Sequence, residues 1–157
     1  MERTLKQREH ETLDREAKHA LEEARMVLPG VQALFGFQLV AVFNQPFERL
    51  LSPAEQRLHL GALLLTAATV ALMMAPAAYH RQAEPHHISS RFVRMASLLL
   101  TAGMFALMLS IWMDCFLIAK ILTKDTLRSV LLISPLALLY VGLWCVLPRV
   151  MRRRCRA

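Results

Sequence analysis

Apolar residues in this chain are gathered into four long runs, and most charged residues lie between them. The runs cover residues 26–43, 58–79, 95–119 and 130–147. A helix needs about 20 apolar residues to cross roughly 30 Å of hydrocarbon. A soluble bundle would carry polar residues at every third or fourth position of each helix, and these runs carry almost none. The pattern therefore predicts an all-α membrane protein with four transmembrane helices.

The segment before the first run has a different pattern, typical of a solvated helix. Acids precede bases by four positions, as in Asp14 and Lys18, which supports a helix. A narrow apolar stripe runs along it and suits packing against protein. Its members are Leu13, Ala17, Ala20, Leu21, Ala24 and Leu28. The predicted domains are a cytoplasmic amphipathic helix at 1–25, a transmembrane domain at 26–148 and a basic tail at 149–157, with a bend near Pro29.

Small and polar residues distinguish the four predicted spans. Ser52, Pro53 and Glu55 form a helix-start signal before span two, which predicts a short helix between spans one and two. Span three places small or polar side chains on one face, and this face is expected to meet protein. They are Ala96, Gly103, Ser110 and Asp114. Span four is rich in leucine and is expected to meet lipid.

The positions of the basic residues orient the predicted helices. Fourteen of the 19 lysines and arginines lie in the N-terminal segment, the middle loop and the tail. Basic residues in short loops stay preferentially on the cytoplasmic side. Both termini are therefore expected in the cytoplasm of a multi-pass protein.

The last nine residues contribute five arginines and no acid to a net charge of +7. These are Arg149, Arg152, Arg153, Arg154 and Arg156. A basic cluster directly after a span favours contact with anionic lipid head groups over contact with nucleic acid. No nucleic-acid partner is predicted.

Composition argues against enzymatic chemistry. At 55% hydrophobic content the chain is too apolar for an ordinary soluble domain, and it lacks phosphate-loop, nucleophile-elbow and zinc-protease motifs. Its three cysteines indicate neither a disulfide framework nor a metal site. His80, His86 and His87 favour a solvated loop over a metal site or pH sensor. Neither a cofactor nor a metal is predicted, and the chain is not expected to be an enzyme.

Asp114 is the only acid inside an apolar run, and an ionisable residue within a span suggests a functional site. It lies towards the outer end of span three. The favoured interpretation is a structural carboxylate paired with Arg49, Arg57 or Arg128, or bonded to the amides of span one. The alternative is ion coordination or proton handling.

Span one is the least apolar and carries amides at Gln32 and Gln38, with Gln45 just beyond. Gln38 and Gln45 are seven residues apart and would share a helix face, whereas Gln32 aligns with Arg25 and Lys18. Amides hold helices together by hydrogen bonds or line a polar path. In the second case, Lys18 and Arg25 would surround a cytoplasmic mouth.

Two strings resemble a bacterial membrane protein family known only as a domain of unknown function. One runs from Glu23 through Pro29, Gly30 and Gln32 to Gln38, and the other is Ala75–Pro76–Ala77–Ala78–Tyr79–His80–Arg81. The resemblance covers roughly residues 20–120. It implies a four-span unit in a bacterial inner membrane and supplies no activity or ligand.

Three functions follow from these residues. The leading hypothesis is a homo-oligomeric ion or small-solute channel with span one lining the path, because one copy of four short spans encloses little space. The second is a membrane scaffold or sensor whose cytoplasmic helix binds a partner. The third is a proton-coupled transporter that uses Asp114.

Overall fold

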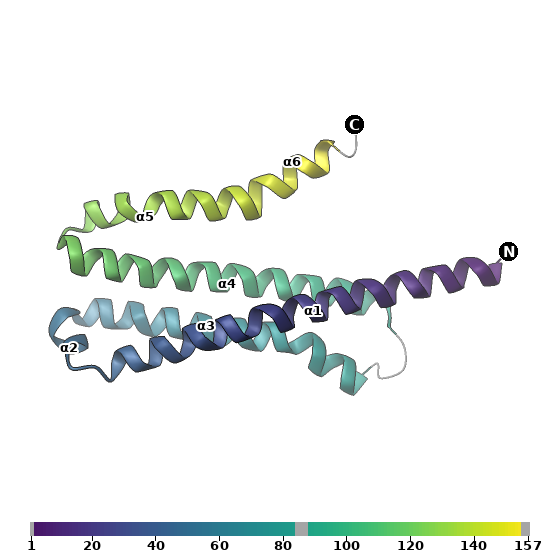
Figure 1. Ribbon diagram of the computed structural model, residues 1–157, viewed down its shortest axis with the longest axis horizontal. Coiled ribbons are helices and arrows are strands. Elements are labelled where there is room, and N and C mark those ends of the chain that lie inside the picture. The colour runs from purple at the N-terminus through teal and green to yellow at the C-terminus, as the bar shows by residue number, and fades with distance from the viewer. Residues whose placement is uncertain (1, 84–87, 155–157) are drawn as a thin grey trace. The chain divides into compact units, whose positions relative to one another are not determined.

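The computed structural model describes residues 2–83 and 88–154, with side chains at 11–83 and 88–151. Its elements are helices α1 (Glu2–Val42), α2 (Pro46–Leu50), α3 (Pro53–Ala83), α4 (Ser90–Thr123) and α5 (Thr126–Val141), a π-helical segment (Gly142–Val146) and α6 (Leu147–Arg154) (Figure 1). The described residues contain no strand. The predicted all-α fold class is confirmed.

Within the described residues, four helices are long and apolar enough to cross a membrane, as in a multi-pass membrane protein. They are Glu11–Val42, Pro53–Ala83, Ser90–Thr123 and Thr126–Met151. Each predicted run lies within one of these helices, except that the first run continues one residue past Val42. The first helix is the least apolar of the four, and the last is the most apolar and has the fewest buried residues.

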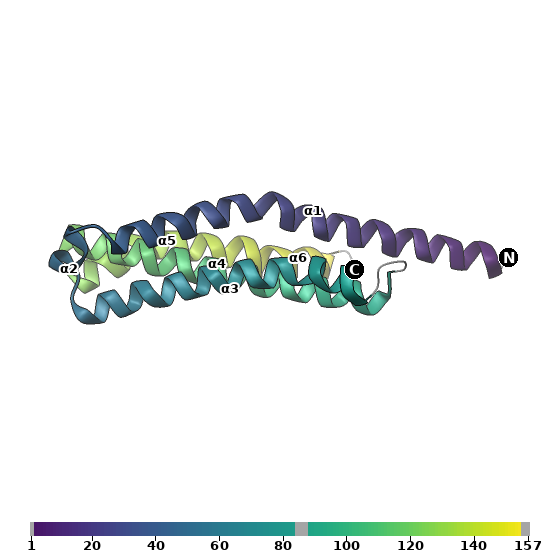
Figure 2. The same cartoon turned by 90° about the horizontal axis from the view of Figure 1, so that it is seen from below.

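Helix α1 contains 41 residues and would be about 60 Å long. The expected cytoplasmic helix and span one are therefore one continuous helix, without an end near residue 25. Pro29 lies inside α1, where its missing N–H group removes a backbone hydrogen bond. Figure 2 shows that α1 is bent rather than straight, as expected from the proline.

The predicted start of span two is confirmed by its hydrogen bonds. Ser52 precedes α3, and its backbone N–H donates to Glu55 Oε2 at 2.7 Å. The Glu55 N–H donates in return to Ser52 Oγ at 3.4 Å. This reciprocal pair is a capping box, with Pro53 at the first helical position. The predicted short helix before it is α2.

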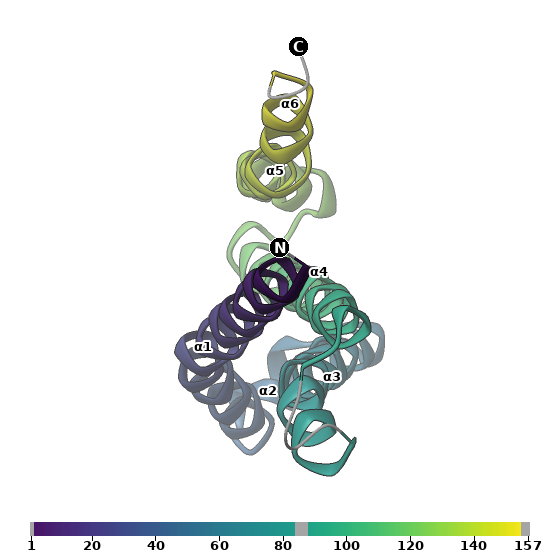
Figure 3. The same cartoon turned by 90° about the vertical axis from the view of Figure 1, so that its right-hand side faces the viewer.

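The chain divides into two compact units, of which the first contains residues 1–43 and 63–107. Here α1 packs through small side chains. Ala17 is buried against Phe92 and Ala96 of α4, and Ala24 is buried against Met73 of α3 and Leu100 of α4. Figure 3, viewed end-on, shows α1 inclined to the first part of α4. The apolar stripe of the N-terminal helix therefore packs against helices of its own chain.

Gly103 lies at the contact between α3 and α4 in this first unit. Thr69 Oγ1 donates to the Gly103 carbonyl at 3.2 Å, and a Cβ on Gly103 would lie 3.4 Å from Met73 Cγ. Small residues allow membrane helices to approach this closely. Ala96, Gly103 and Ser110 are all buried, as expected for a protein-facing stripe on span three.

The second unit contains residues 44–62 and 108–157. Asp125 caps α5 by accepting from the Leu127 N–H at 2.9 Å. The helix that follows is interrupted by the π-helical segment, which directly precedes Pro148 in α6. A π-helical turn is a common way to accommodate a residue that cannot complete the α-helical hydrogen-bond ladder.

Candidate functional site

A buried pair of ionisable side chains joins α3 to α4 in the second unit. His59 Nδ1 lies 3.2 Å from Asp114 Oδ1. The side chains of His59 and Asp114 are 9% and 18% exposed. His59 lies in the second turn of α3, and Asp114 lies nine residues before the end of α4. The pair therefore lies near the start of α3, which follows α2, and towards the end of α4, which precedes α5.

The pair is the middle one of three polar contacts between these helix segments. One turn further towards the C-terminal end of α3, the Ala62 carbonyl accepts a 2.8 Å hydrogen bond from the buried Ser110 hydroxyl. One turn in the other direction, Glu55 Oε1 lies 2.9 Å from Lys120 Nζ. Positions 55, 59 and 62 share one face of α3 because their spacings are four and three. We call these contacts the polar ladder; it consists of Glu55, His59, Ala62, Ser110, Asp114 and Lys120.

One aromatic side chain packs against the His59 ring. The Phe47 ring of α2 lies edge-on to it, with 5.3 Å between ring centroids. Gly61 provides space on α3 for the Met113 side chain, because a Cβ at Gly61 would lie 3.0 Å from the Met113 terminal methyl carbon. The low exposure of the His59 and Asp114 side chains limits the access of water to the pair. Access is greater at Lys120, whose side chain is 32% exposed.

A His–Asp contact of this kind can hold or release a proton. The imidazole N–H donates to the carboxylate, and a protonated imidazole forms an ion pair with it. Within residues 11–83 and 88–151, no group of three or more His, Cys, Asp and Glu side chains is arranged to bind a metal ion. His86 and His87 lie outside the described residues. His80, which was expected with them in a solvated loop, lies instead in the last turn of α3, half-buried beside the Phe92 ring.

Asp114 has a partner, His59, that the sequence did not indicate. The partners expected from sequence were Arg49, Arg57, Arg128 or a span-one amide. Of these, Arg128 contacts Asp125, with 3.5 Å between Nε and Oδ2. The four-residue spacing of His59 from Glu55 was the available signal, since it marks a polar face on α3.

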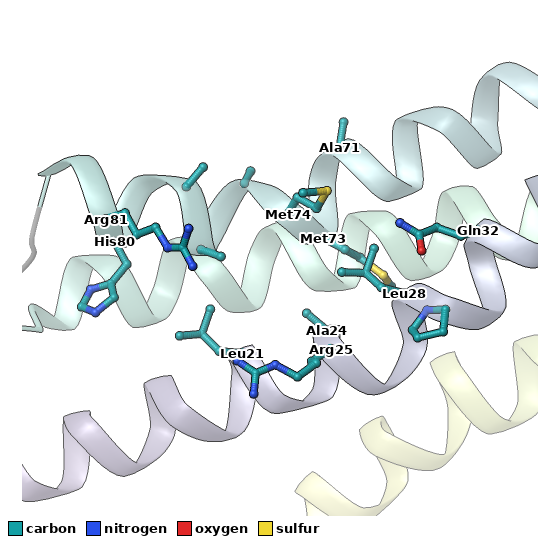
Figure 4. Close-up of a pocket in the computed structure, with 14 residues that line it drawn as sticks. Leu21, Ala24, Arg25, Leu28, Gln32, Ala71, Met73, Met74, His80 and Arg81 are labelled. Carbon is teal, nitrogen blue, oxygen red and sulfur yellow. The ribbon is translucent and has the colours of Figure 1, made fainter.

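The three glutamines occupy different environments. Gln38 is buried, with 4% exposure, whereas Gln32 and Gln45 are exposed. α1 ends at Val42 and Gln45 precedes α2, so the prediction that Gln38 and Gln45 share a helix face is wrong. Helix α1 ends three residues before Gln45, so Gln45 lies on no face of it. Gln32 and Arg25 do share a face, because both line a groove between α1 and α3 (Figure 4).

The remaining predicted positions are mostly at the surface. Lys18 Nζ lies 3.0 Å from Asp14 Oδ2, which confirms the spacing argument for that pair. Arg149 is exposed and donates to the Cys145 carbonyl at 3.0 Å. The other tail arginines have side chains outside the described part. They are Arg152, Arg153, Arg154 and Arg156.

Comparison with known proteins identifies the family. The model of a family of unknown function (DUF6328) matches residues 6–148. The chain belongs to DUF6328. The resemblance to a family of unknown function is thereby confirmed, and the match covers more of the chain than the strings that suggested it. No curated protein and no solved structure matches the chain.

Proposed function

We propose that this DUF6328 protein is a proton-coupled membrane transporter in which the His59–Asp114 pair takes up and releases the proton. The observation that carries the proposal is the 3.2 Å contact between these side chains inside two membrane-spanning helices. Ionisable residues within spans are costly, and they commonly mark proton relays. Histidine is the side chain whose charge changes most readily near neutral pH.

The polar ladder supports a route for the proton on one side of the pair. Glu55 and Lys120 lie between the pair and the nearer ends of their helices. On the other side, Ser110 donates to the Ala62 carbonyl and is fully buried. Proton exchange with water would therefore occur past Glu55 and Lys120. With both termini in the cytoplasm, as the distribution of arginines and lysines favours, this is the outer side of the membrane.

The channel hypothesis receives less support from the geometry. A residue that lines a path between copies should be exposed in one copy, and Gln38 is 4% exposed. Of the span-one amides on α1, only Gln32 is exposed, and it lines the α1–α3 groove. Homo-oligomeric assembly and a mouth formed by Lys18 and Arg25 remain predictions.

The scaffold hypothesis depends on a free apolar stripe at the N-terminal end of α1. Ala17 and Ala24 of that stripe are buried against α3 and α4. A partner would therefore meet mainly the charged face of this helix. This favours the transporter as the first function to test.

The test uses purified full-length protein in liposomes that contain an internal pH indicator. Gradients of a panel of amino acids, sugars, organic acids and cationic drugs are imposed in turn, and the internal pH is recorded. We expect at least one solute gradient to move protons with the wild type and none to do so with Asp114→Asn, which removes the charge but keeps the size. Lys18→Gln, an exposed charge change on α1, is the control. If wild type moves no protons with any solute, or if Asp114→Asn matches it, the proposal fails.

A further inference from the structure

A groove of about 690 Å³ lies between α1 and α3 in the first unit. It is independent of the polar ladder and of the transporter proposal. Leu28, Met73 and Met74 form its apolar middle, and Arg25 and Arg81 lie towards one end (Figure 4). Figure 4 shows Arg81 on the α3 wall of the groove and Arg25 on the α1 wall. Its volume is in the range of sites that hold small organic molecules.

The charged side chains that line the groove are all basic. Its lining contains Arg25, Arg81 and His80 and no acidic residue. The acids closest to Arg25 in sequence face elsewhere: Glu22 contacts His19 at 3.9 Å, and Glu23 lines a separate groove of about 380 Å³ that also contains Glu16. Among the side chains that the structure describes, neither arginine of the groove forms an ion pair. Two guanidinium groups at one end of an apolar groove favour the binding of an anionic group there.

The length of the groove matches one leaflet of a bilayer. Its lining on α3 runs from Ala71 to Arg81, a separation of ten positions that corresponds to a rise of about 15 Å. Half of the hydrocarbon thickness is also about 15 Å. Arg81 lies in the last turn of α3, and so at the membrane–water boundary, whereas Ala71 lies near the middle of that helix. A molecule that fills the groove would have its charge at the head-group level and its apolar part within one leaflet.

We propose that this groove binds one anionic phospholipid, with the phosphate between Arg25 and Arg81 and one acyl chain along Leu28, Met73 and Met74. Basic pockets between membrane helices recognise acidic head groups in this way. A soluble anion would use only the arginine end and would leave the apolar middle uncovered. A zwitterionic lipid would bring a cation next to the two arginines. The groove therefore selects a lipid with net negative charge.

The experiment measures lipid retention by native mass spectrometry of the full chain in a mild non-ionic detergent. The probes are phosphatidylglycerol, phosphatidylcholine with the same acyl chains, and glycerol phosphate. The background variant has the five tail arginines replaced by glutamine, so that head-group contacts at the tail do not contribute. Each of Arg25→Gln and Arg81→Gln is expected to weaken phosphatidylglycerol binding about five-fold, and both together about 25-fold. Arg94→Gln, an exposed arginine on α4 outside the groove, is the matched control and should have no effect.

A second variant tests the apolar part without changing any charge. Ala71 is exposed on the groove wall, so Ala71→Phe would fill the groove while leaving the fold intact. We expect it to reduce phosphatidylglycerol binding at least five-fold. Equal retention of the two lipids, displacement of phosphatidylglycerol by equimolar glycerol phosphate, or an unchanged affinity in either the double arginine variant or Ala71→Phe would each overturn the proposal. So would complete loss of lipid in the tail variant alone.

Discussion

His59 and Asp114, 3.2 Å apart, connect the second turn of α3 to the last third of α4. Either side chain alone would be costly inside a membrane-spanning segment, because its polar atoms would lose water without a partner. Together they satisfy each other and fix the register of these two helix segments. The same contact that stabilises the helices is the one that we propose to carry the proton.

A double-mutant cycle separates the two contributions to stability. We expect His59→Ala and Asp114→Ala each to lower the free energy of unfolding by about 1–3 kcal/mol, because each removes a hydrogen bond made by the other, largely buried side chain. The coupling energy between them should be about 1 kcal/mol, typical of interhelical hydrogen bonds in membranes. Unfolding in mixed micelles with increasing denaturing detergent measures both. A coupling energy near zero would show that the contact contributes no stability.

Gly103 and Gly36 provide a matched pair for close helix packing. A Cβ at Gly103 would already contact Met73 Cγ at 3.4 Å and Leu72 Cβ at 3.5 Å, whereas nothing lies within 4 Å of one at Gly36. We expect Gly103→Leu to destabilise the protein by about 1–3 kcal/mol, because the additional atoms have no space. Gly36→Leu should not destabilise it. Thermal denaturation of both variants in detergent measures the difference, and equal melting temperatures would contradict the packing at Gly103.

The main features of the fold follow from sequence because they depend on local properties. Four apolar runs are long enough to span a bilayer, and the Ser52–Glu55 capping box is formed by residues three positions apart. The contact between His59 and Asp114 joins residues 55 positions apart, so it depends on how far α3 and α4 are shifted along each other. That shift results from packing at residues such as Ser110 and Gly61. Asp114 was therefore predictable as a site, and its contact with His59 was not.

Helical spacing also could not predict where α1 ends. Gln45 was placed on the same face as Gln38 by continuing a helix past Val42, where the backbone turns into α2. Spacing arguments require a continuous helix, and the loop residues Asn44 and Gln45 with Pro46 end it. By contrast, Arg25 and Gln32 lie within α1, and their predicted common face is observed.

The buried serine of the polar ladder has a half-buried counterpart in α5, Ser134. Ser110 donates at 2.8 Å to the Ala62 carbonyl of another helix, whereas Ser134 donates at 2.8 Å to Leu131 in its own helix. We expect Ser110→Ala to lower the free energy of unfolding by about 0.6–1.7 kcal/mol and Ser134→Ala to change it by less than about 0.5 kcal/mol. Detergent unfolding curves provide both values. A larger loss of unfolding free energy for Ser134→Ala than for Ser110→Ala would contradict the structural role of the Ser110 hydrogen bond.

The orientation predicted from basic residues is tested by single cysteines in a background without the three native cysteines. His19 and Glu48 are exposed and lie on α1 and α2. A membrane-impermeant maleimide added to intact cells should label Glu48→Cys, because α2 is expected outside, and should label His19→Cys only after permeabilisation. The opposite pattern would invert the topology and would place the α1–α3 groove in the outer leaflet.

Protonation of the His59–Asp114 pair is tested most directly by infrared difference spectra of the protein in lipid, recorded as the pH changes from about 8 to about 5, where histidine titrates. We predict carboxyl and imidazole bands in the wild type. The carboxyl band that arises from Asp114 should be absent in Asp114→Asn, while bands from the other acids remain. The same band should be shifted in His59→Gln, because the two groups share a hydrogen bond. If the wild type and Asp114→Asn give identical spectra over this range, the pair does not exchange a proton and the proposed function is wrong.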